Sequence, residues 1–565
     1  MPAIHFDRFY RHAEMTELLK AFAAEHPDLV TLESIGTSYE GREIWVASVT
    51  NRKAGEAADK PAIWLDGNIH AVELTASASC LYFLNHLVTN FGKDKRLTHT
   101  LDTRSFYICP RVNPDGAEAA LRDVPYRVRS SMRPYPHTDE QVAGVRPDDV
   151  DGDGRVLYMR VEDPAGPWKP HPDAPALLVA REPDEFEGTF YRLYKEGEIL
   201  DDDGSMAKHQ MPPQGLDLNR NFPADFAPEG KQRGAGPAPF SEPETRALGD
   251  FFITRKNIFM AIAGHTFSGV LLRPGSTVPD EDLPVADLIA YKAMGKKGEE
   301  LTGYPAISVY HDFRYHPKDD IKGTFDWVYD HLGIFTWTIE YWAPHRAAGL
   351  KVENYTDWLF GHSTDDILAL YRFFEKEAPG KGYVDWYEFD HPKLGKVEIG
   401  GWDIQNTFHN PPFHMLEKEI AQFPDWFIYL ALMSPKLELH SAKAEPLGGD
   451  SYLVSLTVEN SGYLPTYGSP IAKDHMIARD MVVEIELPEG ATLTRGRPWQ
   501  EVPHLDGRVG MMSSPVFVGT GFDPKDGSDS RAKAEWIVEA PKGTKLIVSA
   551  RTERAGKVSA TVTCG

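Results

Sequence analysis

Two potential metal ligands, His70 and Glu73, lie three residues apart in the stretch "DGNIHAVELTASA". The apolar run "AIWL" precedes them and a helix-like run follows, so both stand where a strand passes into a helix. His265, in "MAIAGHTFSG", also follows an apolar strand and a glycine that lets the backbone turn. Two His and one Glu leave a fourth position of the metal open for water, which is the arrangement of catalytic zinc. By chance alone, however, His-x-x-Glu is common, and a Glu at a helix start is favoured by the helix dipole.

The surrounding patterns predict the elements that position these residues. Up to about residue 257, helical and strand-like stretches alternate, among them "MTELLKAFAAEH", "REIWVASVT", "AIWLDG" and "RSFYICPRVN". The stretches "NIFMAIAGH" and "IFTWTIEYW" are two later strands. This alternation favours an α/β fold with one mixed central sheet flanked by helices. In such sheets ligands bind beyond the carboxyl ends of the strands, where His70 lies.

Changes in sequence character divide the chain into three parts. Residues 1–353 form the expected α/β domain, with an insertion at about 134–214 that is rich in Pro, Asp and Gly. Residues 354–434, with the helical pattern "STDDILALYRFFEKEA" and the Trp-rich "YVDWYEFDHP", are expected to form a bridging segment. Residues 435–565 contain short alternating strands with turn signals, which predict a C-terminal β-sandwich domain.

Composition excludes several classes of function. The formal net charge of −24 argues against nucleic acid and anionic membranes as partners, because both attract an excess of Lys and Arg. We find no run of about 18 apolar residues and no secretory signal at the start, so a cytoplasmic location is expected. Three cysteines, Cys80, Cys109 and Cys564, are too few for a disulfide framework or a cysteine zinc cluster. Any metal must therefore use His, Asp or Glu.

Six stretches together resemble a known family. They occur in the order "HPDLVTLESIGTSYEGREIWVASVT", "GNIHAVE", "PRVNPDG", "GLDLNRNF", "GHTFSG" and "GTFDWVYDHLGIFTWTIEYW". They resemble motifs of the zinc metallocarboxypeptidases of the carboxypeptidase A type, peptidase family M14, and cover most of residues 5–345 apart from the insertion. The resemblance implies that His70, Glu73 and His265 bind one zinc ion. It also implies that Glu340, in "TIEYW", is the general base and proton shuttle.

Further roles follow from the same resemblance. Asn219 and Arg220 in "DLNRNF" are similar to the pair that grips the substrate's terminal carboxylate, a task that suits the planar fork of arginine. The arginine that stabilises the developing oxyanion should lie in "YRVRSSMR", where the family spacing falls between Arg127 and Arg129. We favour Arg129.

The residues that surround the substrate's last side chain are less directly matched. The tyrosine that caps the substrate should precede "GTFDW", but the loop here is longer, and we choose Tyr310 with Tyr315 as the second choice. Phe325 is expected to line the pocket and to favour apolar or aromatic C-terminal residues. If Arg273 in "LLRPGS" points inward, an acidic residue would be preferred instead.

The insertion contains "DVDGDGR", in which Asp149, Asp151 and Asp153 match the first half of a calcium loop. The twelfth position holds Arg160 instead of the expected Glu, so calcium binding competes with a simpler interpretation as an acidic turn.

The expected function is therefore removal of C-terminal residues from peptides with a free terminal carboxylate, by metal-activated water. A zinc amidohydrolase or deglutamylase that acts on a modified amino acid or cell-wall peptide is one alternative. An inactive peptide- or carbohydrate-binding protein is another, and its ligand affinity should not respond to a zinc chelator. Because the insertion leaves and rejoins the chain between two active-site motifs, we expect it to cover the cleft and restrict substrates to short peptides.

Overall fold

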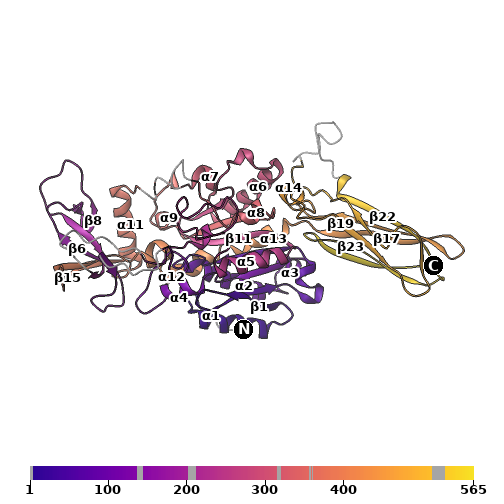
Figure 1. The fold of residues 1–565 in the computed structure, drawn as a ribbon, viewed down its shortest axis with the longest axis horizontal. Helices are drawn as coiled ribbons and strands as arrows, with labels where there is room; N and C mark the ends of the chain where they lie inside the picture. Colours follow the sequence, from indigo (N-terminus) through magenta and orange to yellow (C-terminus); the bar gives the residue numbers. More distant parts are fainter. Residues whose placement is uncertain are drawn as a thin grey trace.

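The computed structural model describes residues 4–136, 144–200, 212–314, 320–355, 358, 361–511 and 528–565. Three parts lie along the long axis of the molecule (Figure 1). The α/β domain is in the middle, and the C-terminal strands lie at one end. At the other end lies a small sheet that includes β6 (Tyr158–Glu162), β8 (Ala174–Ala180) and β15 (Tyr383–His391). No helix in these described ranges combines the length and apolar character needed to cross a membrane.

The central sheet has eight strands in the order β1-β2-β4-β3-β11-β14-β12-β13. Their bounds are β1 Val30–Thr37, β2 Glu43–Val49, β3 Ala62–Gly67, β4 Ser105–Cys109, β11 Ile258–Thr266, β12 Val270–Arg273, β13 Ala306–Ser308 and β14 Phe335–Tyr341. The four middle strands β4, β3, β11 and β14 run parallel, whereas β1, β2 and β12 join antiparallel neighbours. The predicted mixed sheet is confirmed, and its parallel centre brings several carboxyl ends to one edge.

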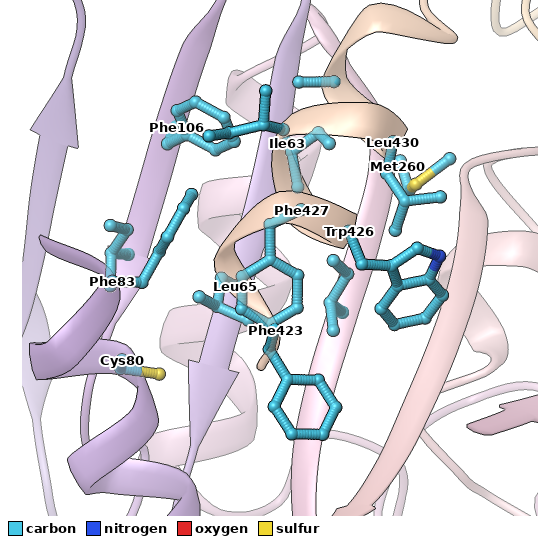
Figure 2. Close-up of a cluster of buried hydrophobic side chains, with 14 of the residues drawn as sticks. Ile63, Leu65, Cys80, Phe83, Phe106, Met260, Phe423, Trp426, Phe427 and Leu430 are labelled. Carbon is cyan, nitrogen blue, oxygen red and sulfur yellow. The ribbon is translucent and has the colours of Figure 1, made fainter. Parts of the chain in front are cut away.

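Helices cover both faces of this sheet. The principal helices are α1 His12–Glu25, α2 Leu74–Asn90, α3 Lys95–Thr103, α4 Pro114–Ala120, α5 Pro243–Thr254, α6 Val285–Thr302, α12 Phe413–Ile420 and α13 Pro424–Leu432. A further helix, α11 Thr364–Glu377, packs on β8 of the insertion instead. Short helices are α7 Val309–Asp312, α8 Trp327–Asp330, α9 Pro344–Ala347 and α14 Pro470–Asp474. Successive side chains of β3 point to opposite faces of the sheet, because side chains alternate along a strand. They therefore belong to two different apolar cores. Ile63 and Leu65 pack with α2 and α13 (Figure 2). Trp64 packs against Phe251 and Phe252 of α5.

The insertion and the bridging segment form one sheet together. Its order is β15-β16-β6-β9-β7-β8, where β6 Tyr158–Glu162, β7 Trp168–His171, β8 Ala174–Ala180 and β9 Tyr191–Lys195 belong to the insertion. Strands β15 Tyr383–His391 and β16 Gly395–Trp402 belong to the bridging segment, and β16 pairs antiparallel with β6. A short ladder of β5 Gly144–Pro147 and β10 Gly197–Leu200 extends the insertion. The two segments are therefore one structural unit, which we call the insertion sheet.

The C-terminal residues form two antiparallel sheets of four strands. One has the order β17-β18-β22-β20, with bounds Leu437–Gly448, Ser451–Asn460, Arg531–Glu539 and Thr492–Arg495. The other has the order β21-β19-β23-β24, with bounds Trp499–Val502, Met481–Glu486, Lys545–Thr552 and Gly556–Thr563. Residues of both sheets, including Trp536 and Val548, share one apolar core, so the predicted β-sandwich is confirmed.

A buried arginine fastens the β-sandwich to the α/β domain. Arg554, between β23 and β24, is only 3% exposed and donates to the carbonyl oxygens of Leu332 and Gly333, the latter at 2.6 Å. Gly333 has a φ of 58°, and a Cβ there would lie 2.3 Å from the backbone nitrogen of Ala472. The sandwich thus holds the loop that leads directly into β14.

We expect Arg554→Ala to lower the free energy of unfolding by about 3 kcal/mol, because two buried carbonyl groups lose a charged donor. Arg551→Ala is the matched control, since the Arg551 side chain is 57% exposed and should change stability by less than about 0.5 kcal/mol. Denaturant unfolding of both variants measures the difference. Equal midpoints for the two variants would show that Arg554 does not fasten the domains.

Candidate active site

The strand-to-helix connection from β3 to α2 places His70 and Glu73. A Cβ at Gly67 would lie 2.7 Å from the backbone of Ala76, so the last residue of β3 must be glycine for the helix to approach. Asn68 adopts a left-handed φ of 62°, and its Nδ2 donates to the carbonyl oxygens of His70, at 2.7 Å, and Ala71, at 3.1 Å. Glu73 occupies the position before the first residue of α2. The sequence therefore turns the chain sharply and directs both side chains to the sheet edge.

His265 and Glu340 reach the same edge from neighbouring strands. They are the second-to-last residues of β11 and β14, and they are direct register partners in this parallel pair. Because β3 also pairs parallel with β11, three carboxyl ends meet here. The structure thus brings His265 and Glu340 to the connection that carries His70 and Glu73.

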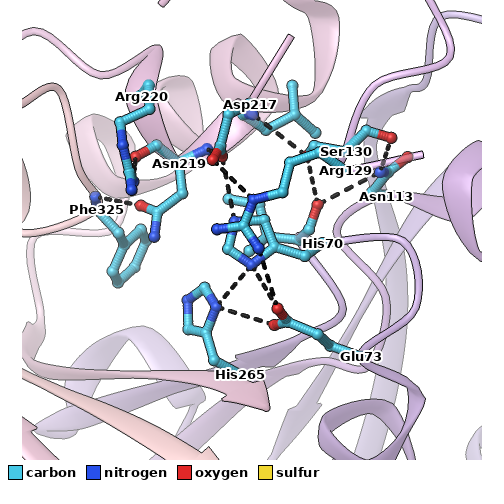
Figure 3. Close-up of polar contacts among 12 residues, drawn as sticks. His70, Glu73, Asn113, Arg129, Ser130, Asp217, Asn219, Arg220, His265 and Phe325 are labelled. Atoms are coloured by element: carbon cyan, nitrogen blue, oxygen red, sulfur yellow. Dashed lines mark hydrogen bonds and ion pairs between the residues drawn. The ribbon is translucent and has the colours of Figure 1, made fainter. Parts of the chain in front are cut away.

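The three predicted metal ligands converge on one point (Figure 3). His70 Nδ1 lies 2.9 Å from Glu73 Oε1 and 3.0 Å from His265 Nδ1, and His265 Nδ1 lies 3.1 Å from Glu73 Oε2. All three residues are buried. Ligands of a tetrahedral zinc ion with bonds of about 2.0–2.2 Å stand about 3.3–3.6 Å apart, so a donor set with spacings of 2.9–3.1 Å is consistent with zinc.

A carboxylate behind His70 fixes the imidazole for metal binding. Asp217 Oδ1 lies 3.1 Å from His70 Nε2, which leaves the lone pair of Nδ1 for the metal when Nε2 carries the proton. Burial would raise the pKa of Asp217, but Arg129 and His70 outweigh it and hold that pKa well below its usual value. Burial lowers the pKa of His265, which keeps its ring neutral, as a ligand must be. Sequence reasoning did not single out Asp217, although it begins the "DLNRNF" stretch.

Glu340 faces the ligand cluster as a carboxyl group with little solvation. Its Oε2 is buried and has no hydrogen-bond partner within the described part of the chain. Burial raises the pKa of Glu340 well above its usual value, and the nearby Glu73 raises it further while Arg129 opposes them. A carboxyl group whose pKa is raised in this way is suited to hold and release a proton.

The two candidate oxyanion arginines lie in different surroundings. Arg129 donates to Asp217 Oδ2 at 3.0 Å and lies 3.4 Å from Glu73 Oε1, so it stands beside the metal ligands. Burial lowers the pKa of Arg127, while Tyr158 of the insertion sheet and Asp403 act in the opposite direction. The structure therefore places Arg129 beside the candidate metal ligands, and its role toward an oxyanion stays a prediction.

A cavity of about 70 Å³ adjoins the ligand cluster. Arg220 lines it, is 6% exposed, and donates from Nη1 to the backbone oxygen of Asn219 at 2.7 Å. Asn219 Oδ1 accepts from the backbone nitrogen of Phe325 at 2.9 Å, which ties the two predicted substrate-binding segments together. The lining residues are His70, Arg129, Asn219, Arg220, His265, Leu272, Ser276, Val309, Phe313, Ile321, Thr324, Phe325, Asp326, Thr338 and Glu340.

Two predicted site residues are not brought to this cavity. Arg273 forms an ion pair with Asp280 at 2.5 Å and is absent from the cavity lining, although its strand neighbour Leu272 is present. Tyr310 lies under the guanidinium of Arg314, at 3.8 Å from the ring centroid, and is also absent from the lining. Tyr315, the second choice for the capping residue, lies outside the described residues.

The comparisons with known proteins agree with this geometry. Residues 15–146 and 186–355 match the zinc carboxypeptidase family, peptidase M14, and residues 436–563 match a domain of unknown function. The chain belongs to the zinc carboxypeptidase family, in which His70, Glu73 and His265 form a buried set consistent with zinc.

Individual relatives are distant from this chain. Rat carboxypeptidase A2 is 24% identical over 342 residues, which are 58% of this chain and 61% of that protein. Bovine carboxypeptidase B2 is 24% identical over 369 residues, 62% of this chain and 67% of that protein. Among solved structures, thrombin activatable fibrinolysis inhibitor is 20% identical with a TM-score of 0.41, covering 75% of this chain and 74% of that one.

We expect Asp217→Asn to weaken zinc binding about 10- to 100-fold, because the amide holds the His70 tautomer less firmly than a carboxylate does. Competition with a calibrated chelator measures the affinity. Asp250→Asn, at an exposed position of α5, is the control. An unchanged zinc affinity in the Asp217 variant would mean that Asp217 does not orient His70.

Proposed function

We propose that this chain is a zinc-dependent carboxypeptidase that removes single residues from the C-terminal end of peptides. The observation that carries the proposal is the convergence of His70, His265, Glu340 and Arg220 on one small cavity, with Glu73 beside the two histidines in the candidate metal set. Zinc, when bound, supplies a Lewis acid that polarises the scissile carbonyl and activates water.

The chain's own residues divide the remaining work. Arg220 and Asn219 bind the terminal carboxylate, since a guanidinium can hold it by two parallel hydrogen bonds. Glu340 accepts a proton from the attacking water and passes it to the leaving amine. Arg129, beside the ligands, stabilises negative charge that develops on the carbonyl oxygen. All four residues belong to the α/β domain.

The side-chain pocket favours apolar C-terminal residues. Its wall includes Leu272, Val309, Phe313, Ile321 and Phe325. Burial of an apolar or aromatic side chain against this wall is favourable, because apolar surface is removed from water. The pairing of Arg273 with Asp280 leaves no basis for an acidic preference at this position.

Mass spectrometry of a mixed peptide library tests the proposal. The zinc-loaded protein should release single C-terminal residues, whereas a sample with a zinc chelator should not. A second library with amidated C-termini should stay intact. If the amidated library is cleaved at the same rate, the protein is an amidohydrolase instead of a carboxypeptidase. If neither library is cleaved although zinc is bound, the proposed function is rejected.

Calcium binding in the insertion is a separate prediction. Carboxylate oxygens of Asp149, Asp151 and Asp153 lie within 4.8 Å of one another, while Asp149 also accepts backbone N–H groups of the same turn, as the competing interpretation expects. Arg160 pairs with Glu398 and provides no ligand. Calorimetric titration with calcium decides between the two interpretations.

The cytoplasmic location also stays a prediction, to be checked by cell fractionation.

A further inference from the structure

A second cavity lies between the start of the chain and α2. It is lined by residues of the first ten positions, by Met15 of α1, by part of α2, and by Arg111, which follows β4. It shares no lining residue with the cavity that Arg220 lines. The lining includes the cations Arg8 and Arg111 and contains neither Asp nor Glu. We call this space the Arg111 cavity.

Arg111 brings a buried positive charge to this cavity. The residue is only 3% exposed, and its Nη2 donates to the backbone oxygen of Tyr10 at 2.8 Å. Because Tyr10 also lines the cavity, the guanidinium end of the side chain lies there. Its Nε and Nη1 are buried and have no hydrogen-bond partner among the residues that the structure describes. Two nitrogens of a buried guanidinium are therefore available to an acceptor in the cavity.

Ser77 of α2 adds a hydroxyl group to the same cavity. The residue is 2% exposed, and its Oγ is buried without a hydrogen-bond partner in the described ranges. A serine inside a helix often donates to the carbonyl oxygen one turn earlier, but the Ser77 hydroxyl makes no such bond. Two side chains from different elements thus offer donors to one enclosed space.

The charge of Arg111 has no dedicated carboxylate partner. Glu118 is the acid that acts on Arg111 most strongly, but both of its oxygens are used elsewhere. Its Oε1 accepts from the backbone nitrogen of His12 at 2.6 Å, and its Oε2 accepts from Arg11 Nε at 3.0 Å. Burial lowers the pKa of Arg111 to about 10, so the group is still charged at neutral pH. A buried charge is costly without a partner, and an anion in the cavity removes this cost.

The size of the cavity restricts the anion to a single atom. The centre of a water-sized sphere can move within about 10 Å³, and a space of about 10–15 Å³ holds one such sphere. Phosphate, sulfate and a carboxylate side chain of another molecule are too large. A water molecule fits, but it is neutral and leaves the charge of Arg111 without a counter-ion. Chloride is the common anion that meets both conditions.

We propose that the Arg111 cavity binds one chloride ion, which accepts hydrogen bonds from Arg111 and Ser77. The ion ties the segment of residues 5–10 to α2, the helix that begins directly after Glu73. The site is separate from the proposed carboxypeptidase reaction and does not depend on it, since neither donor belongs to the active-site cavity.

Diffraction from crystals grown in sodium chloride tests the site directly. Data are collected on both sides of the chlorine absorption edge, where chloride gives a difference in anomalous signal and water gives none. The sulfur of Met15, which lines the same cavity, scatters anomalously at both wavelengths and is the internal reference. A chlorine peak within hydrogen-bond distance of Arg111 and Ser77 is expected. Density there without a chlorine signal means water and overturns the proposal.

Hydrogen exchange tests whether chloride also binds in solution. The protein is compared in sodium chloride and in sodium gluconate at equal ionic strength, because gluconate is too large for the cavity. Backbone amides of residues 5–10 should exchange about tenfold more slowly when chloride is at about ten times its dissociation constant, and the effect should saturate, as binding at one site requires. A chlorine peak in the crystal with equal exchange in the two salts would mean an adventitious ion only and would overturn the proposal.

Three variants assign the effect to the cavity. In Arg111→Met the exchange rates in chloride and gluconate should be equal, and an unchanged ratio would overturn the proposal. Ser77→Ala removes a hydroxyl without a partner, so it should fold like the wild type and need about tenfold more chloride for the same protection, the usual effect of one hydrogen bond to an ion. Arg52→Met, at an exposed arginine, should keep the full chloride effect. The ratio is measured within one protein sample, so lower stability of a variant does not imitate the loss of binding.

Discussion

Glu340→Gln is expected to reduce peptide hydrolysis about 10²- to 10⁴-fold, the usual contribution of a positioned general base. Glutamine has the size of glutamate but cannot accept the proton of the attacking water. The loss should appear in kcat with little change in KM, because Glu340 acts on the reaction rather than on binding. Single-turnover and steady-state kinetics on a peptide that ends in Phe measure both quantities.

Two controls make the Glu340 result specific. The zinc content of the variant should equal that of the wild type, because the ligands His70, Glu73 and His265 are unchanged. Glu281→Gln, whose side chain is 76% exposed, should keep normal activity. If the Glu340 variant hydrolyses the peptide at a rate within threefold of the wild-type rate, then Glu340 is not the general base.

Arg220→Gln is expected to lower kcat/KM about 10²- to 10³-fold for peptides with a free C-terminus. The substitution removes the guanidinium that pairs with the substrate's terminal carboxylate. The negative charge of that carboxylate is then buried without a positive partner. Because Arg220 is 6% exposed and lines the cavity, water cannot easily replace it. The same substitution should change the slow cleavage of amidated peptides by less than about threefold, so the preference for a free carboxylate should nearly disappear.

Arg246→Gln, at an exposed position of α5, is the matched control and should keep the full preference. If Arg220→Gln slows free and amidated peptides equally, then Arg220 supports the fold of the site instead of binding the carboxylate.

The convergence of the candidate metal ligands could be predicted from the sequence because the order of the strands brings them together. His70, His265 and Glu340 each follow an apolar strand, and parallel neighbours end at one edge. Asp217 acts through His70, and no local pattern indicates that an acid in a loop will meet a histidine 147 residues earlier. The one indication in the sequence was that Asp217 lies in the same motif as Arg220, "DLNRNF".

The side-chain pocket was harder to predict. Leu272 and Arg273 are adjacent in a strand of four residues, so they point to opposite sides, and nothing in the stretch shows which side faces the cavity. The position of Tyr310 depends on the path of a loop whose length differs from the family pattern. Sequence also did not reveal that the insertion pairs with the bridging segment, because β6 and β16 are more than 200 residues apart and ladder pairing has no local signature.

The shared insertion sheet constrains how this protein can be shortened or recombined. The apolar residues Met159 of β6 and Ile399 of β16 lie in one core, and Tyr158 pairs with Gly400 across the two segments. Deletion of the insertion alone would uncover the edge of β16 and one face of its hairpin, which invites aggregation through strand pairing. A chimera would therefore have to receive both segments together, as two pieces of a single graft separated in the gene by residues 215–353 of the α/β domain.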